Sequence, residues 1–83
     1  MSGPVSAVVE TIAKALVDAP DAVRVTETVH RGTTLVELTV ADGDTGKVIG
    51  RQGRIAEALR TIVAATAHLH GTRAALEIRD PDR

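Results

Sequence analysis

The chain has 83 residues, of which 43% are hydrophobic and 25% are charged, and this length leaves room for one small domain. The absence of cysteine excludes disulfide bonds, thiolate zinc sites and cysteine catalysis, and the absence of Phe, Tyr and Trp excludes recognition by stacking bases on aromatic rings. No apolar run reaches the roughly 18 residues of a membrane helix, and the first residues lack the features of a secretory signal. We therefore expect a single cytoplasmic domain over residues 1–83, with a core at about residues 4–79 and a polar tail at residues 80–83.

The first expected element is an amphipathic helix from about Pro4 to Val17. Apolar residues recur in this segment at helical spacing, and a proline is well suited to the first turn of a helix. Residues 18–21 contain a second proline, which disfavours helical geometry in the residue before it. The helix should therefore end there.

Two alternating segments then predict a hairpin. Residues 23–30 alternate valines with polar residues, although Glu27 falls on the apolar face, and residues 35–40 alternate in the same way. The Arg31-Gly32 turn between them is too short to offer much additional contact surface. A polar, glycine-containing loop follows, in which Asp44 is placed to cap the next helix.

The second half of the chain predicts two helices and a strand. A short helix starts at Thr45 and is interrupted at residues 50–53, and a long helix begins at Arg54. Gly71 suits the position after its C-terminus, and residues 73–79 alternate as a last strand. The apolar face expected for the long helix consists of Ile55, Ala58, Leu59, Ile62, Val63, Thr66 and Leu69.

The resulting order of elements is α-β-β-α-α-β. The connection through two helices allows the third strand to lie parallel to one of the first two. Because the strands alternate, we expect the helices to cover only one face of a three-stranded mixed sheet. The fold class is therefore α+β.

Positive charge is concentrated around the interruption between the two helices. The net charge of the chain is −1, but residues 47–60 carry four basic side chains against one acidic side chain. Gly50 and Gly53 allow backbone angles that other residues avoid and leave space for a close approach of another molecule. The first N–H groups of the following helix have no intrahelical partner and attract anions. The segment is thus suited to a sugar-phosphate backbone.

The sequence motifs in this segment resemble those of a known family. Val48-Ile-Gly-Arg-Gln-Gly53 resembles the V-I-G-x-x-G core of KH domains, whose GXXG loop clamps four nucleotides. The resemblance is closer still to small bacterial single-KH proteins of the KhpA or YlqC group, through residues 12–17, 46–56 and 58–61. It covers residues 4–79 and implies a type II KH fold, with three helices covering one face of the sheet.

The resemblance also implies which residues bind single-stranded RNA. Gly50, Arg51, Gln52 and Gly53 would contact its backbone, with Lys47 and Arg54 as flanking charges. The apolar groove would be built from Val48, Ile49 and Ile55 on one side and Val36 and Leu38 on the other.

The functional hypothesis is an RNA-binding protein without cofactor, membrane partner or enzymatic activity. The resemblance implies a homodimer, or a heterodimer with a larger KhpB- or Jag-type protein, and roles as an RNA chaperone or post-transcriptional regulator and in cell shape, division and cell wall biogenesis. Two alternatives remain, namely a protein-interaction subunit with weak nucleic-acid binding, and a protein that binds single-stranded DNA.

Other candidate motifs do not predict a catalytic or metal site. His68 and His70 fall on different faces of a helix, and no carboxylate lies at ligand spacing from them or from His30. Asp42 and Asp44 are interpreted as loop and cap residues. The glycines before Lys47 do not have the spacing of a Walker A loop.

Overall fold

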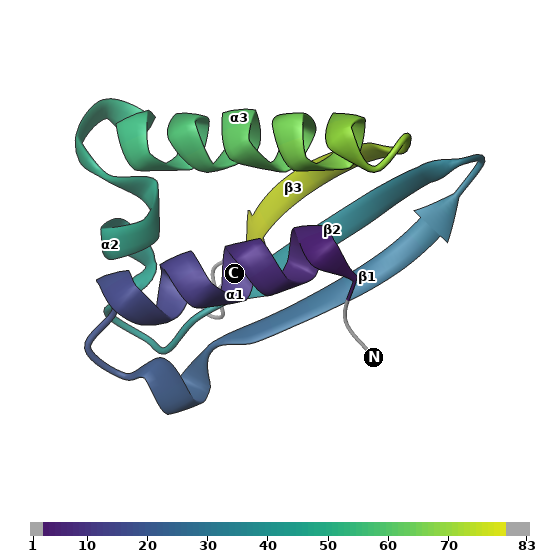
Figure 1. Cartoon of the computed structure of the whole chain (residues 1–83). Helices are drawn as coiled ribbons and strands as arrows, with labels where there is room; N and C mark the ends of the chain where they lie inside the picture. The colour runs from purple at the N-terminus through teal and green to yellow at the C-terminus, as the bar shows by residue number, and fades with distance from the viewer. Residues whose placement is uncertain (1–2, 80–83) are drawn as a thin grey trace.

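A computed structural model describes residues 3–79 and has the predicted order of elements (Figure 1). The expected polar tail at residues 80–83 lies outside the described residues. Two short 3-10 helices occupy connections between the main elements. In chain order the elements are α1 (Pro4–Leu16), the first 3-10 helix (Pro20–Ala22), β1 (Arg24–His30), β2 (Thr33–Thr39), α2 (Thr45–Ile49), the second 3-10 helix (Arg51–Gly53), α3 (Arg54–Leu69) and β3 (Arg73–Arg79).

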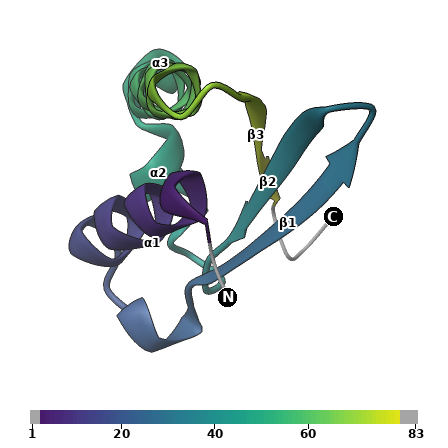
Figure 2. The same ribbon diagram turned by 45° about the vertical axis from the view of Figure 1, so that its right-hand side comes forward.

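The sheet has the strand order β1-β2-β3. β1 pairs with β2 in antiparallel register, and β2 pairs with β3 in parallel register, with Thr33 opposite Arg73. The parallel pair requires the crossover through α2 and α3, which lie on the same side of the sheet as α1 (Figure 2). The predicted α+β fold of type II KH arrangement, with its mixed sheet and one helical face, is therefore confirmed.

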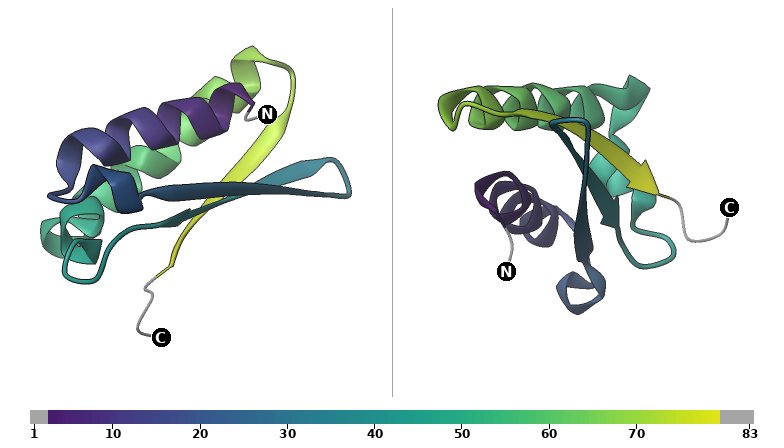
Figure 3. Two further views of the ribbon diagram at one scale, coloured as in Figure 1. Left: turned by 90° about the horizontal axis from the view of Figure 1, so that it is seen from below. Right: turned by 90° about the vertical axis from the view of Figure 1, so that its right-hand side faces the viewer.

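The core lies between the sheet and the two long helices. α1 packs on β1 and β2, α3 packs on β3, and the two helices contact each other. The view from below shows both helices on the same side of the sheet (Figure 3). The aliphatic core residues with almost no exposed surface are Val9, Ala13, Val36, Leu38, Val48, Leu59, Val63 and Ala67. No helix within residues 3–79 has the length and apolarity needed to cross a membrane.

The far end of the hairpin is much less buried than its base. At the turn that joins them, β1 and β2 extend beyond the N-terminal end of α1 (Figure 1). Val29, which was expected on the buried face of the strand, is 69% exposed. Alternation of the sequence thus identified the strand, but it did not show where the helical cover ends.

The buried face of α3 is rotated from the face expected from the sequence. Leu59 and Val63 are buried as expected, but Ala56 and Ala67 complete the core stripe. Ile62 and Leu69 are 37% and 82% exposed. The expectation was wrong because both sides of this helix carry aliphatic residues, so their spacing alone did not show which side is buried.

Glu27 has a structural role that explains its place in an otherwise apolar strand pattern. Its carboxylate accepts hydrogen bonds from the backbone N–H of Gly3, at 3.0 Å, and from the hydroxyl of Ser6. Ser6 is buried in the first turn of α1. The carboxylate thereby fixes the start of α1 against β1, where the free N–H groups of a helix favour negative charge.

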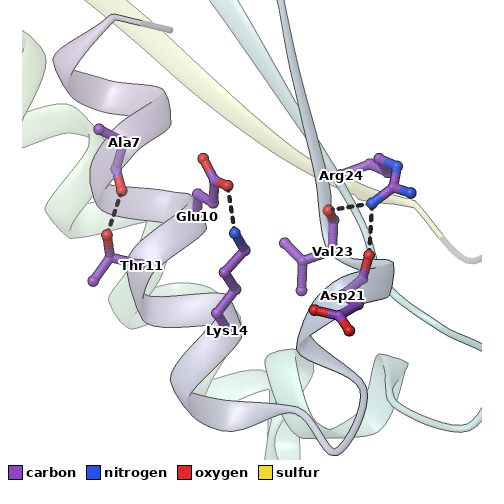
Figure 4. Close-up of polar contacts among 7 residues, drawn as sticks. All are labelled: Ala7, Glu10, Thr11, Lys14, Asp21, Val23 and Arg24. Carbon is purple, nitrogen blue, oxygen red and sulfur yellow. Dashed lines mark hydrogen bonds and ion pairs between the residues drawn. The ribbon is translucent and has the colours of Figure 1, made fainter.

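Polar contacts at the surface support the connection from α1 to β1 (Figure 4). Lys14 pairs with Glu10 at 2.7 Å on the exposed side of α1. Arg24 donates hydrogen bonds from its guanidinium group to the carbonyl oxygens of Asp21, at 2.8 Å, and Val23, at 3.0 Å. The arginine therefore ties the first 3-10 helix to the start of β1.

The orientation of α3 can be tested with two aliphatic truncations. Leu59→Ala should lower the free energy of unfolding by about 2–5 kcal/mol, because the side chain is buried and its removal leaves a cavity. Ile62→Ala should have a much smaller effect, because this residue is partly exposed. Urea denaturation of both variants measures the difference. Equal losses would show that the helix does not have the orientation described.

Candidate functional site

The interruption between α2 and α3 is a tight backbone corner. Gly50 ends α2 with φ 80° and ψ 172°, Gln52 has φ 58°, and Gly53 begins α3 with φ 74°. Three of the four residues at positions 50–53 thus have positive φ, a region that glycine adopts easily and other residues adopt at a cost. We call residues 50–53 the glycine loop.

The two glycines of the loop are required for different reasons. A Cβ atom at Gly50 would lie 2.6 Å from Cγ1 of Ile55 and 2.9 Å from its backbone nitrogen, closer than atoms can approach. A Cβ atom at Gly53 would have no heavy atom within 4 Å apart from its chain neighbours. Gly50 therefore allows the chain to pack directly on the first turn of α3, whereas Gly53 leaves open space beside the loop.

The backbone of the loop leaves donors free. The N–H of Gly50 donates to the carbonyl oxygen of Gly46 at 2.9 Å, and the N–H of Gly53 donates to that of Gly50 at 3.1 Å. Within residues 3–79, the N–H groups of Arg51 and Gln52 make no such bond. They lie just before α3, whose 16 residues direct the positive end of the helix dipole toward the loop. This arrangement favours an anionic ligand.

Side chains of the loop add positive charge without closing it. Arg51, Gln52 and Arg54 are all exposed. Arg54 donates a hydrogen bond from Nη2 to Oε1 of Gln52 at 3.2 Å, which links the two side chains. Arg51 makes no ion pair with another residue of the described segment. Of the predicted basic residues, Arg51 is therefore the one most available to a ligand.

Lys47 is engaged by two carboxylates. Its ammonium nitrogen lies 3.2 Å from Oδ2 of Asp18 and 3.6 Å from Oδ1 of Asp44. The hydrogen bond and the charge of Asp18, followed by those of Asp44, raise the pKa of Lys47 above its ordinary value. The side chain thus stays protonated, but its charge is partly neutralised by its partners. The sequence predicted that Lys47 lies beside the loop, but it did not predict the ion pair with Asp18.

Asp44 has a different role from the one expected. It precedes α2 but makes no capping hydrogen bond with its side chain. Its carboxylate instead accepts a hydrogen bond from the N–H of Ala19 at 3.1 Å, and the residue is only 4% exposed. Asp44 therefore joins the connection after α1 to the start of α2, and in this way it positions the helix that precedes the glycine loop.

The structure separates the expected apolar groove residues into two groups. Val36, Leu38 and Val48 are fully buried, so their side chains belong to the core and offer no surface to a ligand. Ile49 and Ile55 flank the loop and are only partly buried. The accessible apolar surface next to the glycine loop is consequently smaller than the sequence suggested, and it comes from these two isoleucines.

No group of residues within positions 3–79 has the arrangement of a metal site. The structure brings together no three His, Cys, Asp or Glu side chains that could hold an ion in that range. The candidate site therefore consists of the glycine loop, its arginines and the two partly buried isoleucines.

Comparisons with known proteins identify the family to which the chain is similar. A family model described as "KhpA/KhpB, KH domain" matches residues 6–78. A protein of Treponema pallidum named RNA-binding protein KhpA is 55% identical over 69 residues, which are 83% of this chain and 86% of the relative. Proteins of the same name are 56% identical in Caldanaerobacter subterraneus, over 84% of this chain and 93% of the relative, and 54% identical in Aquifex aeolicus, over 86% and 90%.

The unequal roles of the two glycines predict unequal effects of substitution. Gly53→Ala should lower the free energy of unfolding by about 1–2 kcal/mol, the cost of a left-handed conformation for a residue with a side chain. Gly50→Ala should cost more, because its Cβ also collides with the first turn of α3. Urea denaturation compares the two variants. A smaller loss for Gly50→Ala than for Gly53→Ala would contradict the packing described.

Proposed function

The chain belongs to the KhpA/KhpB family of KH domains, and from this premise we propose that it binds single-stranded RNA at the glycine loop. The observation that carries the proposal is the open corner at residues 50–53, where Arg51 and Gln52 are exposed and their N–H groups make no backbone hydrogen bond within residues 3–79. The relatives named RNA-binding protein KhpA support RNA as the ligand. The bound segment would have about four nucleotides, as in other GXXG loops.

In this proposal, the backbone and the bases of the RNA are held by different groups. The N–H groups of Arg51 and Gln52 bind phosphate oxygens, and the guanidinium group of Arg51 adds a charged hydrogen bond. Gly53 leaves the space through which the sugar-phosphate backbone approaches. The bases lie against Ile49 and Ile55, because the chain has no aromatic residue on which they could stack.

The proposed activity is binding rather than catalysis. Contacts with backbone phosphates tolerate many sequences, which suits an RNA chaperone or post-transcriptional regulator acting in the cytoplasm. We propose that the whole of residues 1–83 serves as one KH domain, of which the family match covers residues 6–78. Single-stranded DNA remains the competing ligand, and competition between RNA and DNA oligomers of the same sequence distinguishes the two.

Replacement of the loop side chains tests the site. Arg51→Asp with Gln52→Asp should weaken binding of a short oligoribonucleotide by about tenfold or more, because negative charge would then face the phosphates. The matched control is Arg60→Asp with Ala64→Asp, which makes the same charge change on exposed residues of α3. Fluorescence anisotropy at physiological salt measures both. Unchanged binding by the loop variant, or an equal loss in the control, would contradict the proposal.

The second proposal concerns assembly. One loop buries little surface and should bind weakly, whereas two linked sites bind far more tightly. The exposed side of α3 carries Ile62 and Leu69, which are spaced by seven residues and share a helix face. Ala58 and Ala65 lie on the same face and are also exposed. We propose that a second copy of the chain covers this face, and a larger KhpB-type protein is the alternative occupant.

Charge substitution on α3 tests this assembly. Ile62→Glu with Leu69→Glu should convert a dimer to a monomer in sedimentation equilibrium, because two apolar contacts become charged. The same variant should lose affinity for long RNA more than for a four-nucleotide segment. A wild-type chain that stays monomeric at all concentrations would exclude the homodimer. A protein-interaction subunit without real phosphate contacts would show RNA affinity that hardly changes with salt.

A further inference from the structure

A second group of basic residues lies at the opposite end of α3 from the glycine loop. A pocket of about 530 Å³ is formed there between the β1–β2 turn and the α3–β3 turn. Figure 1 shows both turns at the end of the molecule away from the connection between α2 and α3. The residues that line the pocket are Arg31, Gly32, His68, Gly71, Thr72 and Arg73.

The parallel pairing of β2 and β3 creates this pocket. Thr33 at the start of β2 lies opposite Arg73 at the start of β3. The two turns that precede these residues are therefore side by side, and they bring Arg31 and Arg73 to one place from positions 42 residues apart. The sequence predicted that the Arg31-Gly32 turn offers little contact surface. This prediction took no account of the α3–β3 turn, which lies beside it in the fold.

The chemistry of the lining favours an anion with several oxygen atoms. The pocket has two arginines, a histidine and a threonine but no acidic residue. Neither arginine makes an ion pair with another residue in the range 3–79. Gly32 and Gly71 let a ligand approach the backbone without a side chain between them. Guanidinium groups match the geometry of phosphate oxygens and bind them with two parallel hydrogen bonds.

The conformation of Arg31 is a second observation at the same place. It has φ 52° and is followed by Gly32 with φ 80°, so both central residues of the turn are left-handed. Asparagine, aspartate and glycine are the usual residues at the first of these positions. An arginine stands here instead, and it lines the same pocket as Arg73.

A second pocket lies next to the pocket of Arg31 and Arg73, and its lining includes an acidic residue. It shares Thr72 with the first pocket but contains Glu27, whose carboxylate already accepts hydrogen bonds from Gly3 and Ser6. An anion is therefore favoured on the side of the two arginines and disfavoured on the side of the carboxylate.

We propose that this pocket binds a backbone phosphate of the same RNA strand that the glycine loop holds. This inference rests on the proposed function and extends it, because the footprint then includes the far end of α3 as well as the loop. α3 has 16 residues and separates the two sites by about 24 Å at the usual rise of a helix. A four-nucleotide segment occupies the loop alone, whereas a longer strand reaches both sites.

The test compares two RNA lengths in charge-neutralised variants. Arg31→Asn keeps a residue that tolerates the left-handed turn, and Arg73→Gln keeps a polar side chain that is nearly as long. The double variant should bind a four-nucleotide segment as the wild type does. For a longer uridine oligomer, its plot of log affinity against log salt should be less steep by about 0.7, because the single phosphate that the pocket neutralises contributes about 0.7 to the slope. Thermal denaturation by circular dichroism confirms that the variant is folded.

The control is Arg24→Gln, which removes one arginine charge, half of the change in the double variant, at the other end of β1. It should leave both the affinity and the salt dependence for the longer strand unchanged. A wild-type salt dependence in the double variant, or an equal effect of Arg24→Gln, would overturn the inference while leaving the proposed function in place. Failure of the wild type to bind the four-nucleotide segment would overturn the proposed function, and this extension with it.

Titration with inorganic phosphate separates the two sources of the ligand. Nuclear magnetic resonance follows the amides of Gly32, Gly71 and Thr72 during addition of phosphate alone and of the longer oligomer. We expect the oligomer to shift these amides at lower concentration than phosphate does. Shifts with phosphate alone and none with the oligomer would show a small-anion site and contradict binding of the strand.

Discussion

The candidate site depends on the contact between the backbone of Gly50 and the first turn of α3. The chain can reverse there only because Gly50 lacks a Cβ atom, which would lie 2.6 Å from the side chain of Ile55. The contact fixes α2 against α3, and the N–H groups of Arg51 and Gln52 in the corner make no backbone hydrogen bond within residues 3–79. Without it, the arginines would be an ordinary charged surface. With it, they are placed beside backbone donors that already favour an anion.

The electrostatics of the chain follow from the same organisation. Most acidic residues belong to the rest of the domain, and two of them, Asp18 and Asp44, engage Lys47 beside the loop. The cationic character of the site thus comes mainly from Arg51 and Arg54. Asp44 also holds the N–H of Ala19, so one buried carboxylate both positions α2 and reduces the charge next to it. A net charge of −1 is compatible with phosphate binding because local potential governs the encounter.

Local features of the sequence predicted most of the fold. Alternating residues identified the three strands, and glycines at positions 50 and 53 identified the corner between two helices. The buried face of α3 could not be predicted correctly, because Ile62 and Leu69 are as apolar as the residues that form the core. Alternation correctly placed Val36 and Leu38 on one apolar face of the sheet, but it did not show that the helices cover this face so completely that neither side chain offers surface to a ligand.

The features that the sequence did not predict depend on contacts between segments that are distant in the chain. Lys47 pairs with Asp18, and Arg31 and Arg73 line one pocket, although no motif in the sequence connects these positions. Both depend on how the elements pack, the second one on the parallel register of β2 and β3. In the sequence these basic residues are far apart, whereas the fold brings them together at the two ends of α3.

The most direct test of the account is a nuclear magnetic resonance titration of the full chain with a four-nucleotide RNA. The account predicts that the amides of Arg51, Gln52 and Gly53 shift first and furthest, since they form the open corner. Shifts confined to other surfaces, with these three amides unmoved at saturation, would contradict it.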